Sequence, residues 1–408
     1  MRMKAEDRDL LSLRAKRRGV EGVLGQLSPD PVPTIPFHYG YPFPGSYPLE
    51  AMAQAAQDAL RLDGADALGY KGGSCAESFS EQVMARSRER DMPTDPTTTI
   101  ITSGSAQAIQ LICNVLLDIG DKVLVEGPTY MGALTLFRNY GADVVAVDLD
   151  EDGVRVEAMA ERLEAWAKAG KAGPKLFYAI PNFNNPTGVS MSTARRQAVL
   201  DLARQYGFLI LEDDAYGELR FEGEASPTLR ALDTADRVVH VGSMSKILAP
   251  GVRLGWAVGP EWLIRRMEIH KADGGTNQLS RAVVGECWRQ LDVPKRLDWL
   301  RAGYRRRRDA ALEALDAEMP SKCTWSHPLG GYFLWLTLPE TLRAETLLPE
   351  MIQEGVKPLT GGQFFPDGRG QNCFRISYSY PEPDDIRAGI RRMARVIKRH
   401  LTGRKTCE

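Results

Sequence analysis

The sequence predicts an α/β protein with a mostly parallel, seven-stranded sheet in a large domain and a smaller α+β domain after it. Two observations predict this fold class. Between residues 97 and 258, short apolar segments alternate with amphipathic segments of helical periodicity. After about Asp292 the pattern changes to an Arg-rich helix and short strands. We therefore expect an N-terminal helix and arm over residues 1–48, a large domain over 49–292 and a small domain over 293–408.

The first part of the chain is expected to hold helices and an extended arm. Helical spacing over residues 4–25 precedes a Pro-rich segment from Ser28, which continues into the aromatic run Phe37-His-Tyr-Gly-Tyr-Pro-Phe-Pro-Gly-Ser-Tyr-Pro. So many aromatic and proline residues in one segment indicate that it packs against another part of the protein. A helix is then expected over residues 49–62, and another after the Gly-rich turn that begins at Leu68.

The elements of the two domains follow from periodicity. The seven expected strands of the large sheet are residues 99–102, 122–126, 143–148, 175–180, 208–212, 237–241 and 254–258. The clearest helices between them are 106–117 and 193–206, and the second domain is expected to contain helices 295–319 and 383–400 with strands 332–338 and 373–378. Ligands bind at the carboxyl ends of the strands in such sheets, so we expect the functional residues there.

Composition excludes several classes of protein. The 52 basic and 53 acidic residues give a net charge of -1, which provides no general attraction to nucleic acid or to an anionic membrane. The six cysteines are scattered and the five histidines form no paired motif, so neither a disulfide framework nor a metal site is predicted. No apolar run approaches the length of a membrane span. We expect a cytoplasmic protein without nucleic-acid or membrane partners.

One segment places a lysine among apolar and hydroxyl residues at the end of a buried strand. The run Val241-Gly-Ser-Met-Ser-Lys246 is followed by a Pro/Gly turn that carries Arg253. Burial lowers the pKa of a lysine towards the range in which the neutral amine is a nucleophile. Taken alone, a solvated surface lysine is the more common interpretation. The residues at the other strand ends favour the functional interpretation.

Polar residues of complementary chemistry follow three other strands. The run Thr102-Ser-Gly-Ser105 leads into a helix whose first N–H groups suit a phosphate, although an ordinary helix cap is equally consistent. Asn185 precedes a proline and so cannot be helical, which holds its amide out at the end of the strand, although a plain loop is the simpler interpretation. An acidic cluster, residues 212–214, precedes Tyr216. Such a cluster is usually solvated or metal-binding, but without paired histidines a carboxylate that faces a cationic ring nitrogen becomes an alternative.

Together these groups describe the chemistry of pyridoxal phosphate: a lysine that captures an aldehyde, a carboxylate for the pyridine nitrogen, donors to the phenolic oxygen and a phosphate cup. The ordered set is more specific than any of its parts. The sequence closely resembles the fold type I, pyridoxal-phosphate-dependent aminotransferases of class I and II, particularly the branch with 2-aminoadipate and kynurenine aminotransferases. The resemblance runs from about Phe37 to His400, and it includes the runs Gly330-Gly-Tyr-Phe-Leu-Trp and Phe374-Arg-Ile-Ser-Tyr-Ser.

The resemblance implies a role for each site residue. Lys246 would carry the internal aldimine of pyridoxal 5'-phosphate and then move the Cα proton of the substrate. Asp213 would pair with the pyridine nitrogen, and Tyr216 and Asn185 would bond the ring 3'-oxygen. The phosphate would be bound by Ser105, Ala106, Ser243, Ser245 and Arg253; Tyr130 would stack on the ring; Arg375 would bind the substrate α-carboxylate, with Gly40 and Asn185 lining the same pocket. In this family two sites lie across a homodimer interface, so Tyr70 would reach the phosphate of the neighbouring subunit.

The expected reaction is amino transfer between an L-amino acid and a 2-oxo acid. The sequence departs from the family pattern at Ala106 and Asn184, where relatives often have Gln, and at Cys75, where they have Gly. These departures keep a second hypothesis open, a pyridoxal-phosphate-dependent oxidase, cyclase, decarboxylase or lyase of specialised metabolism on the same fold. An aminotransferase-like transcriptional regulator is less favoured, because fewer than about forty residues precede the arm and a DNA-binding module needs more. The sequence does not predict which amino acid is used.

Overall fold

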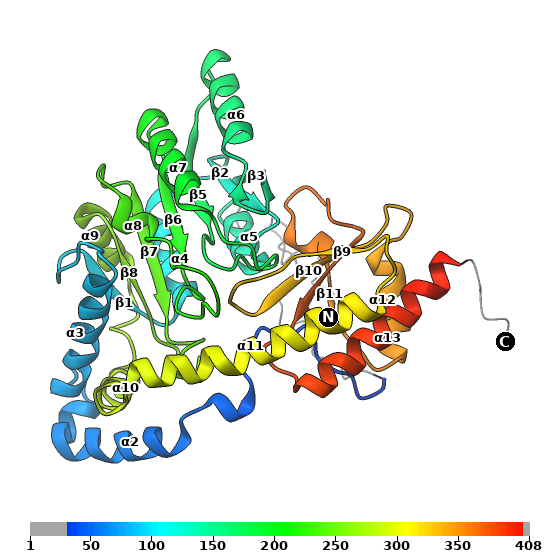
Figure 1. Ribbon diagram of the computed structural model, residues 1–408. Helices are drawn as coiled ribbons and strands as arrows, with labels where there is room; N and C mark the ends of the chain where they lie inside the picture. Colours follow the sequence, from blue (N-terminus) through cyan, green and yellow to red (C-terminus); the bar gives the residue numbers. More distant parts are fainter. Residues whose placement is uncertain (1–30, 403–408) are drawn as a thin grey trace, which may run out of the picture.

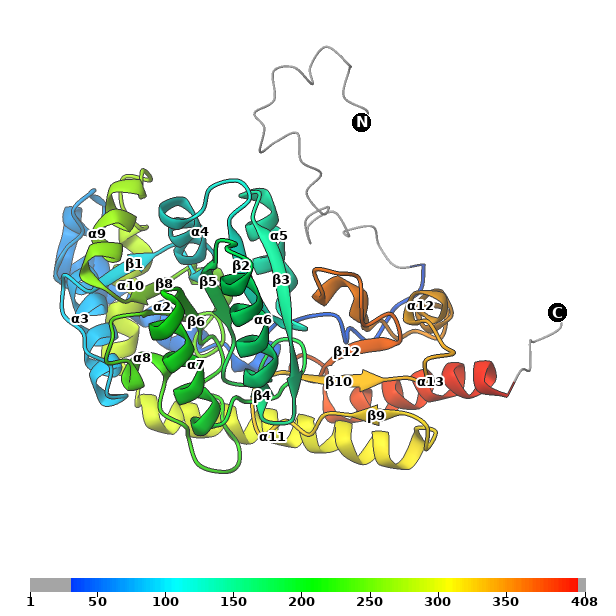
Figure 2. The same cartoon turned by 90° about the horizontal axis from the view of Figure 1, so that it is seen from above.

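The computed structural model describes residues 31–402, so the helix expected over residues 4–25 lies outside the described part of the chain. Its largest element is an eight-stranded sheet with the strand order β1-β8-β7-β6-β5-β2-β3-β4, flanked by helices (Figure 1). A second sheet has four strands in the order β11-β12-β10-β9. The two sheets form separate bodies that lie side by side, with the helix α11 running along both (Figure 2).

The large sheet contains all seven predicted strands, each within a few residues of its predicted bounds. They are β1 (Thr99–Thr102), β2 (Lys122–Gly127), β3 (Asp143–Asp150), β5 (Pro174–Ala179), β6 (Leu209–Asp213), β7 (Val238–Ser243) and β8 (Gly255–Val258). The strands β7, β6, β5, β2 and β3 pair in parallel, whereas β8 is antiparallel to both of its neighbours. The eighth strand, β4 (Gly153–Val154), is a two-residue return of β3 that is too short to show a sequence period.

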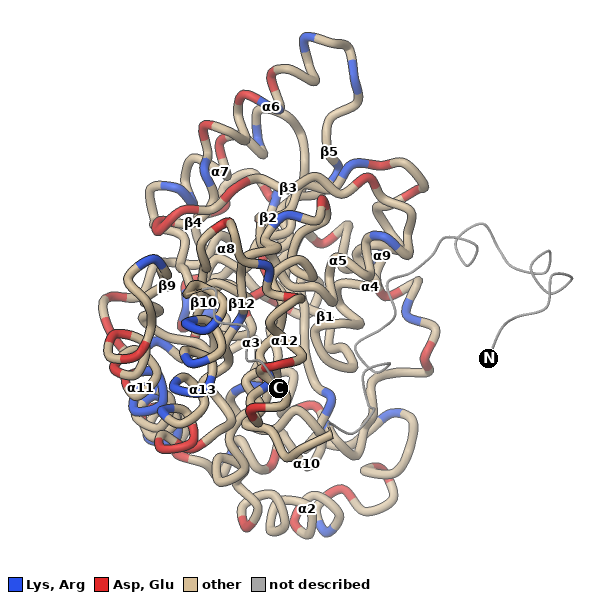
Figure 3. The backbone as a smooth tube through the Cα atoms, turned by 90° about the vertical axis from the view of Figure 1, so that its right-hand side faces the viewer, with Lys and Arg blue, Asp and Glu red and all other residues tan. Residues whose placement is uncertain are grey.

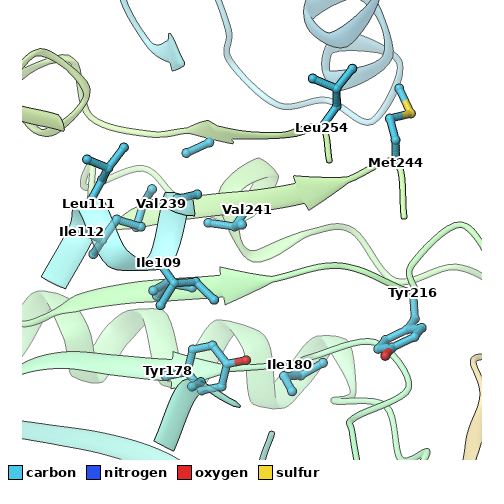
Figure 4. Close-up of a cluster of buried hydrophobic side chains, with 14 of the residues drawn as sticks. Ile109, Leu111, Ile112, Tyr178, Ile180, Tyr216, Val239, Val241, Met244 and Leu254 are labelled. Carbon is cyan, nitrogen blue, oxygen red and sulfur yellow. The ribbon is translucent and has the colours of Figure 1, made fainter. Parts of the chain in front are cut away.

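Helices cover both faces of the large sheet because alternate residues of its strands are apolar on both sides. Along β5, Leu176 and Tyr178 belong to one buried cluster and Phe177 and Ala179 to another. Figure 4 shows part of the first cluster, including Tyr178 on its strand. The helices before β8 are α2 (Leu49–Asp63), α3 (Ser74–Glu89), α4 (Ser105–Leu116), α5 (Met131–Asn139), α6 (Val156–Lys168), α7 (Thr193–Tyr206) and α8 (Leu229–Leu232), and those after it are α9 (Glu261–His270) and α10 (Gln278–Gln290).

The second sheet is antiparallel and is covered by two helices. Its strands are β9 (Thr324–Trp325), β10 (Phe333–Thr337), β11 (Leu359–Thr360) and β12 (Cys373–Ser377), and the helices are α12 (Ala344–Gln353) and α13 (Pro383–Leu401). The long helix α11 (Val293–Glu318) is shared by both bodies, since Leu297 packs in the core of the large sheet and Leu315 in the core of the small one. We propose that the domain boundary falls at Asp292, the N-cap of this helix.

The aromatic arm connects the two bodies. Its first residues pair with the small domain, because the Ile35 N–H donates to Gly355 O at 2.9 Å and the Ser377 N–H donates to Phe37 O at 2.9 Å. Phe37 is buried in the small core, whereas Phe43 is buried in the large one. The arm residues between them therefore lie where the two domains meet.

Lys and Arg residues are frequent along α11 and α13 (Figure 3), and acidic residues form ion pairs with several of them. Arg308 forms an ion pair with Glu222 at 2.7 Å, and Arg387 forms one with Glu313 at 3.2 Å. This surface is therefore of mixed charge. Between residues 31 and 402 no helix combines the length and the apolar character that a membrane span requires.

Candidate active site

Lys246 lies in the loop that follows β7, where the two domains meet. Its Nζ donates a hydrogen bond to the Gly40 carbonyl of the arm at 2.8 Å and lies 5.7 Å from the ring centre of Tyr332. Burial lowers the pKa of the Lys246 amine to about 8, and the positive charges of Arg375 and Arg253 act in the same direction. The amine therefore has a substantial neutral fraction near neutral pH, as a nucleophile or a proton acceptor requires.

Asp213 ends β6, the strand next to β7, and the residue is 6% exposed. Its Oδ2 accepts a hydrogen bond from the Tyr178 hydroxyl at 2.7 Å, whereas Oδ1 is buried and has no hydrogen-bond partner. Burial raises the pKa of Asp213 to about 6, and the Tyr178 hydrogen bond opposes that increase. A buried acceptor without a partner is costly unless a ligand satisfies it, and a protonated pyridine nitrogen is a suitable donor.

Arg375 projects from β12 into the same region and is 3% exposed. Its Nη1 donates to Asn185 Oδ1 at 3.1 Å, its Nη2 donates to His38 O at 2.6 Å, and its Nε is buried without a partner. Burial lowers the pKa of Arg375 to about 10, so the guanidinium remains positive at neutral pH. A buried cation of this kind, with a free donor, suits the carboxylate of a substrate.

Asn185 and Tyr216 complete the part of the site near the sheet. Asn185 is 5% exposed, in the turn that follows β5, and Tyr216 is 6% exposed in the loop after β6. Asn185 Oδ1 accepts from Arg375, and the Asn185 side chain opposes the effect of burial on the pKa of Tyr216. Burial raises the pKa of Tyr216, so the hydroxyl stays protonated and can donate to a ligand oxygen.

The start of α4 forms a cradle for an anion. Ser105 and Ala106 begin the helix, whose first N–H groups lack partners within the helix. Gly104 precedes them with φ 81°, and a Cβ on this glycine would collide with the Arg253 guanidinium. A Cβ on Gly255 would lie 2.7 Å from the Ser105 nitrogen. Glycine at both positions therefore allows Arg253 and a neighbouring strand to approach the helix start.

The two serines of the Lys246 loop are held together beside β8. Ser243 Oγ donates to Ser245 Oγ at 2.9 Å and accepts from the Ser245 N–H at 3.1 Å. Tyr130 is the N-cap of α5, and burial raises the pKa of its hydroxyl. Hydrogen bonds thus join the two predicted serines to each other, Asn185 to Arg375, and Gly40 to Lys246.

Within a single chain, the Tyr70 side chain does not lie with the other predicted site residues. Its side chain is 91% exposed, and only its backbone carbonyl is engaged, by Gln278 Nε2 at 3.1 Å. It lines an open groove of about 280 Å³ together with residues 67–69 and 273–279. The described chain by itself therefore does not bring the Tyr70 side chain to the other site residues.

Several residues of the site were not singled out from the sequence. Tyr178 lies in an apolar strand and is indistinguishable from a core tyrosine by pattern. Tyr332 donates from its hydroxyl to Lys246 O at 3.2 Å, and the resemblance pointed only to its surrounding segment. Glu126 is the penultimate residue of β2 and is 1% exposed, and its position near a strand end is the signal that the sequence offers.

The residues present fit pyridoxal 5'-phosphate. Lys246 offers an amine of lowered pKa, Asp213 an unsatisfied buried oxygen, and the start of α4 a glycine-lined cradle beside Arg253. Fold and site thus define a pyridoxal-phosphate-dependent enzyme.

The comparisons with known proteins identify the family. Residues 39–393 match the family described as aminotransferase class I and II, and the chain belongs to this family. It is 37% identical over 375 residues to aromatic-amino-acid aminotransferase 1 of Thermococcus litoralis, covering 89% of this chain and 87% of the relative. The structure of Pyrococcus horikoshii kynurenine aminotransferase superposes with a TM-score of 0.89 at 36% identity, covering 97% of this chain and 99% of that one.

A further solved relative contains a derivative of the cofactor. It is the α-aminoadipate aminotransferase of Thermus thermophilus, solved with N-(5'-phosphopyridoxyl)-L-leucine, with a TM-score of 0.87 at 33% identity over 97% of this chain and 99% of that one. The protein described here is accordingly a pyridoxal-phosphate-dependent transaminase that uses amino acid and 2-oxo acid substrates.

Proposed function

We propose that Lys246 is the residue that binds the cofactor and gives it up to an incoming L-amino acid. The observation that carries this assignment is the convergence of Lys246, Asp213 and Arg375 from three separate elements on one buried site. When bound, pyridoxal phosphate supplies an aldehyde for amine exchange and an electron-accepting ring. The chain supplies an ionised Asp213 for the ring nitrogen and the Asn185 and Tyr216 groups for the ring oxygen.

Lys246 then acts on the Cα proton of the substrate. An amine with a pKa of about 8 can both accept and return a proton near neutral pH. The Gly40 carbonyl holds Nζ at 2.8 Å, and the Tyr332 hydroxyl bonds the Lys246 carbonyl at 3.2 Å. These two contacts restrict where the amine can lie, which favours proton transfer at one face of the substrate.

Arg375 binds the α-carboxylate of the substrate. Its planar guanidinium matches a carboxylate in a bidentate arrangement, and it is held in place by Asn185 on one side and the His38 carbonyl on the other. The ring of Phe333 lies 4.3 Å from its central carbon, which supports the cation from a further side. The substrate would therefore be oriented before proton transfer.

We also propose an aromatic L-amino acid as the preferred amino donor. Tyr39 stacks on Tyr41 at 4.9 Å and meets the edge of Tyr380 at 5.3 Å, and Tyr39 lies between His38 and Gly40, whose carbonyls bond Arg375 and Lys246. A planar side chain can pack against such rings. One relative is named as an aromatic-amino-acid aminotransferase, and another was solved with kynurenine, which supports the same choice.

The experiment that tests this function is a visible spectrum of the purified holoenzyme during addition of single L-amino acids, without an oxo acid and with dissolved oxygen recorded. We expect L-phenylalanine, L-tyrosine or L-kynurenine to convert the cofactor to pyridoxamine phosphate, and 2-oxoglutarate to restore the original band. L-alanine and L-2-aminoadipate serve as comparison donors. Oxygen consumption, or turnover without pyridoxamine phosphate, would instead support the oxidase, cyclase, decarboxylase or lyase hypothesis.

A homodimer with shared active sites is a further part of the proposal. Tyr70 is 91% exposed, and Leu62, Leu68 and Ile269 are 64%, 69% and 67% exposed, so contact with a partner subunit would remove this apolar surface from water. We propose that Tyr70 reaches the phosphate of the partner's site. Mixing the variants Lys246→Ala and Tyr70→Ala should restore activity, because each mixed dimer would contain one complete site, whereas non-shared sites would give no such recovery.

We place the protein in amino-acid metabolism, in a biosynthetic role in the cytoplasm. The cytoplasmic location is supported by the cysteines, because a reducing compartment keeps thiols free. Five cysteines are buried free thiols: Cys75, Cys113, Cys287, Cys323 and Cys373. Burial raises the pKa of the Cys75 thiol to about 11, which keeps it protonated and unreactive. Cell fractionation followed by immunodetection tests the location, and recovery in a membrane or exported fraction would contradict it.

A further inference from the structure

Glu126 is a buried acid at the carboxyl end of β2, two strands away from the strand that carries Asp213. It is 1% exposed, and its Oε2 accepts two hydrogen bonds of 2.8 Å, from the Ile180 N–H and from Asn184 Nδ2. Burying a carboxyl group is costly, and two donors on one oxygen offset only part of that cost. This uncompensated cost indicates that the Glu126 side chain has a role beyond packing.

Asn184 is the centre of the turn that presents Asn185. Its Oδ1 accepts from the Thr187 N–H at 3.2 Å and from the Thr187 hydroxyl at 3.0 Å. Its backbone N–H donates to Val189 O at 2.8 Å, and its carbonyl accepts from the Gly188 N–H at 2.6 Å. With Nδ2 on Glu126, every polar group of Asn184 is engaged. The side chain thus joins the turn to the end of β2.

Asn185 depends on this turn for its orientation. Its Oδ1 accepts from Arg375 at 3.1 Å, so its Nδ2 is the group left to donate towards the proposed position of the cofactor's phenolic oxygen. A turn free to shift by even an ångström would lose one of these contacts, because hydrogen bonds weaken steeply with distance and angle. Holding Asn184 therefore also holds Asn185.

We propose that Glu126 is a positioning residue of the active site, which acts through Asn184 to fix the orientation of Asn185. This inference rests on the proposed function, since it presumes that Asn185 donates to the phenolic oxygen of a cofactor bound at Lys246. Glu126 touches neither cofactor nor substrate in this arrangement. Its effect reaches the site through one side chain and one peptide bond.

The test uses the pH dependence of the visible band of the lysine-bound cofactor in the holoenzyme. A hydrogen bond to the phenolic oxygen stabilises the negative charge on that oxygen. The nitrogen that joins Lys246 to the cofactor therefore loses its proton at lower pH. Asn185→Ala should raise the midpoint of this transition by about one pH unit, the value of one hydrogen bond. Glu126→Ala should raise it in the same direction and by a similar amount.

Three further variants make the result specific. Asn184→Ala removes the donor of the hydrogen bond to Glu126 and should give the same shift of the midpoint. This variant decides the outcome if Glu126→Ala does not fold. Glu126→Gln keeps an acceptor oxygen and should restore the wild-type midpoint. The double variant Glu126→Ala, Asn185→Ala should shift no further than Asn185→Ala alone, because both act on one contact.

A matched control comes from Glu212, another buried acid, which accepts from the Leu229 N–H at 2.8 Å and the Arg230 N–H at 3.1 Å, on the first residues of α8. Glu212→Ala should lower the unfolding temperature and leave the midpoint unchanged. An unchanged midpoint in both Glu126→Ala and Asn184→Ala, while Asn185→Ala shifts it, would overturn the positioning role alone. A wild-type protein with no lysine-bound band would instead overturn the proposed function.

Discussion

The Tyr178 hydroxyl donates a 2.7 Å hydrogen bond to Oδ2 of Asp213, and the two residues lie on the neighbouring strands β5 and β6. The other carboxylate oxygen is left without a partner. Burial raises the pKa of Asp213 to about 6, and the Tyr178 hydrogen bond opposes this effect because it stabilises the ionised form. Tyr178 therefore helps to keep charged the acid that we assign to the pyridine nitrogen.

Replacing Tyr178 by Phe should lower kcat at pH 7 by about tenfold or more, the effect of losing a hydrogen bond to a charged group. Without its donor, Asp213 has a pKa above 6 and is more protonated at pH 7. The loss should shrink as the pH rises and Asp213 ionises. A pH profile of kcat measures this. Phe137→Leu, which alters a ring that packs 5.5 Å from Tyr178, controls for packing, and an unchanged kcat in Tyr178→Phe would contradict the assignment.

Arg375→Lys should raise the KM for the amino acid by about 30-fold or more, because lysine cannot reproduce the bidentate guanidinium contact. The effect on kcat should be smaller, since the reacting groups remain. Steady-state kinetics with a single donor separates the two constants. Arg369→Lys is a suitable control, because Arg369 is an exposed arginine that pairs with Asp148. Equal changes in KM for both variants would rule out the role of Arg375.

Cofactor capture by the cofactor-free protein should accelerate with pH and reach half its maximum near pH 8, where Lys246 loses its proton. An exposed lysine, with a pKa of about 10.4, would show its midpoint more than two units higher. Because the Arg375 charge lowers the Lys246 pKa, Arg375→Met should move the midpoint upward. Stopped-flow absorbance after mixing with pyridoxal phosphate gives both values, and a midpoint unmoved by Arg375→Met would count against this electrostatic coupling.

Gly104→Ala should weaken cofactor binding at the start of α4. The new Cβ would collide with Arg253, and φ 81° is itself unfavourable for alanine. Gly120→Ala provides a matched control, because Gly120 has φ 92° with no atom within 4 Å of the added Cβ. Both variants should lose about 1–3 kcal/mol of stability from backbone strain. Only Gly104→Ala should raise the dissociation constant for pyridoxal phosphate, measured by fluorescence titration, and an equal rise in both would refute the cradle.

Much of this fold was predictable because its strands are short apolar segments between periodic helices. The predicted strand 99–102 and the helix 193–206 coincide with β1 and α7. The reversed direction of β8 was not predictable, because an apolar strand has the same period in either direction. The same holds for β4, where two residues show no period.

The site was predictable where chemistry interrupts a pattern. Lys246 and Asp213 stand at strand ends among residues of other types, and proline marks the turn of Asn185. Tyr178 could not be recognised, because its ring packs in the apolar core while only its hydroxyl reaches Asp213. Glu126 acts through a side chain 58 residues further along the chain, a contact that only the fold creates.

The assignment of the cofactor to Lys246 can be tested by reducing the holoenzyme with borohydride, digesting it and locating the phosphopyridoxyl group by mass spectrometry. We expect one modified peptide, with the label on Lys246, and no stable label in Lys246→Ala. Label on any other lysine, or an unlabelled Lys246 in a protein that retains its visible band, would contradict it.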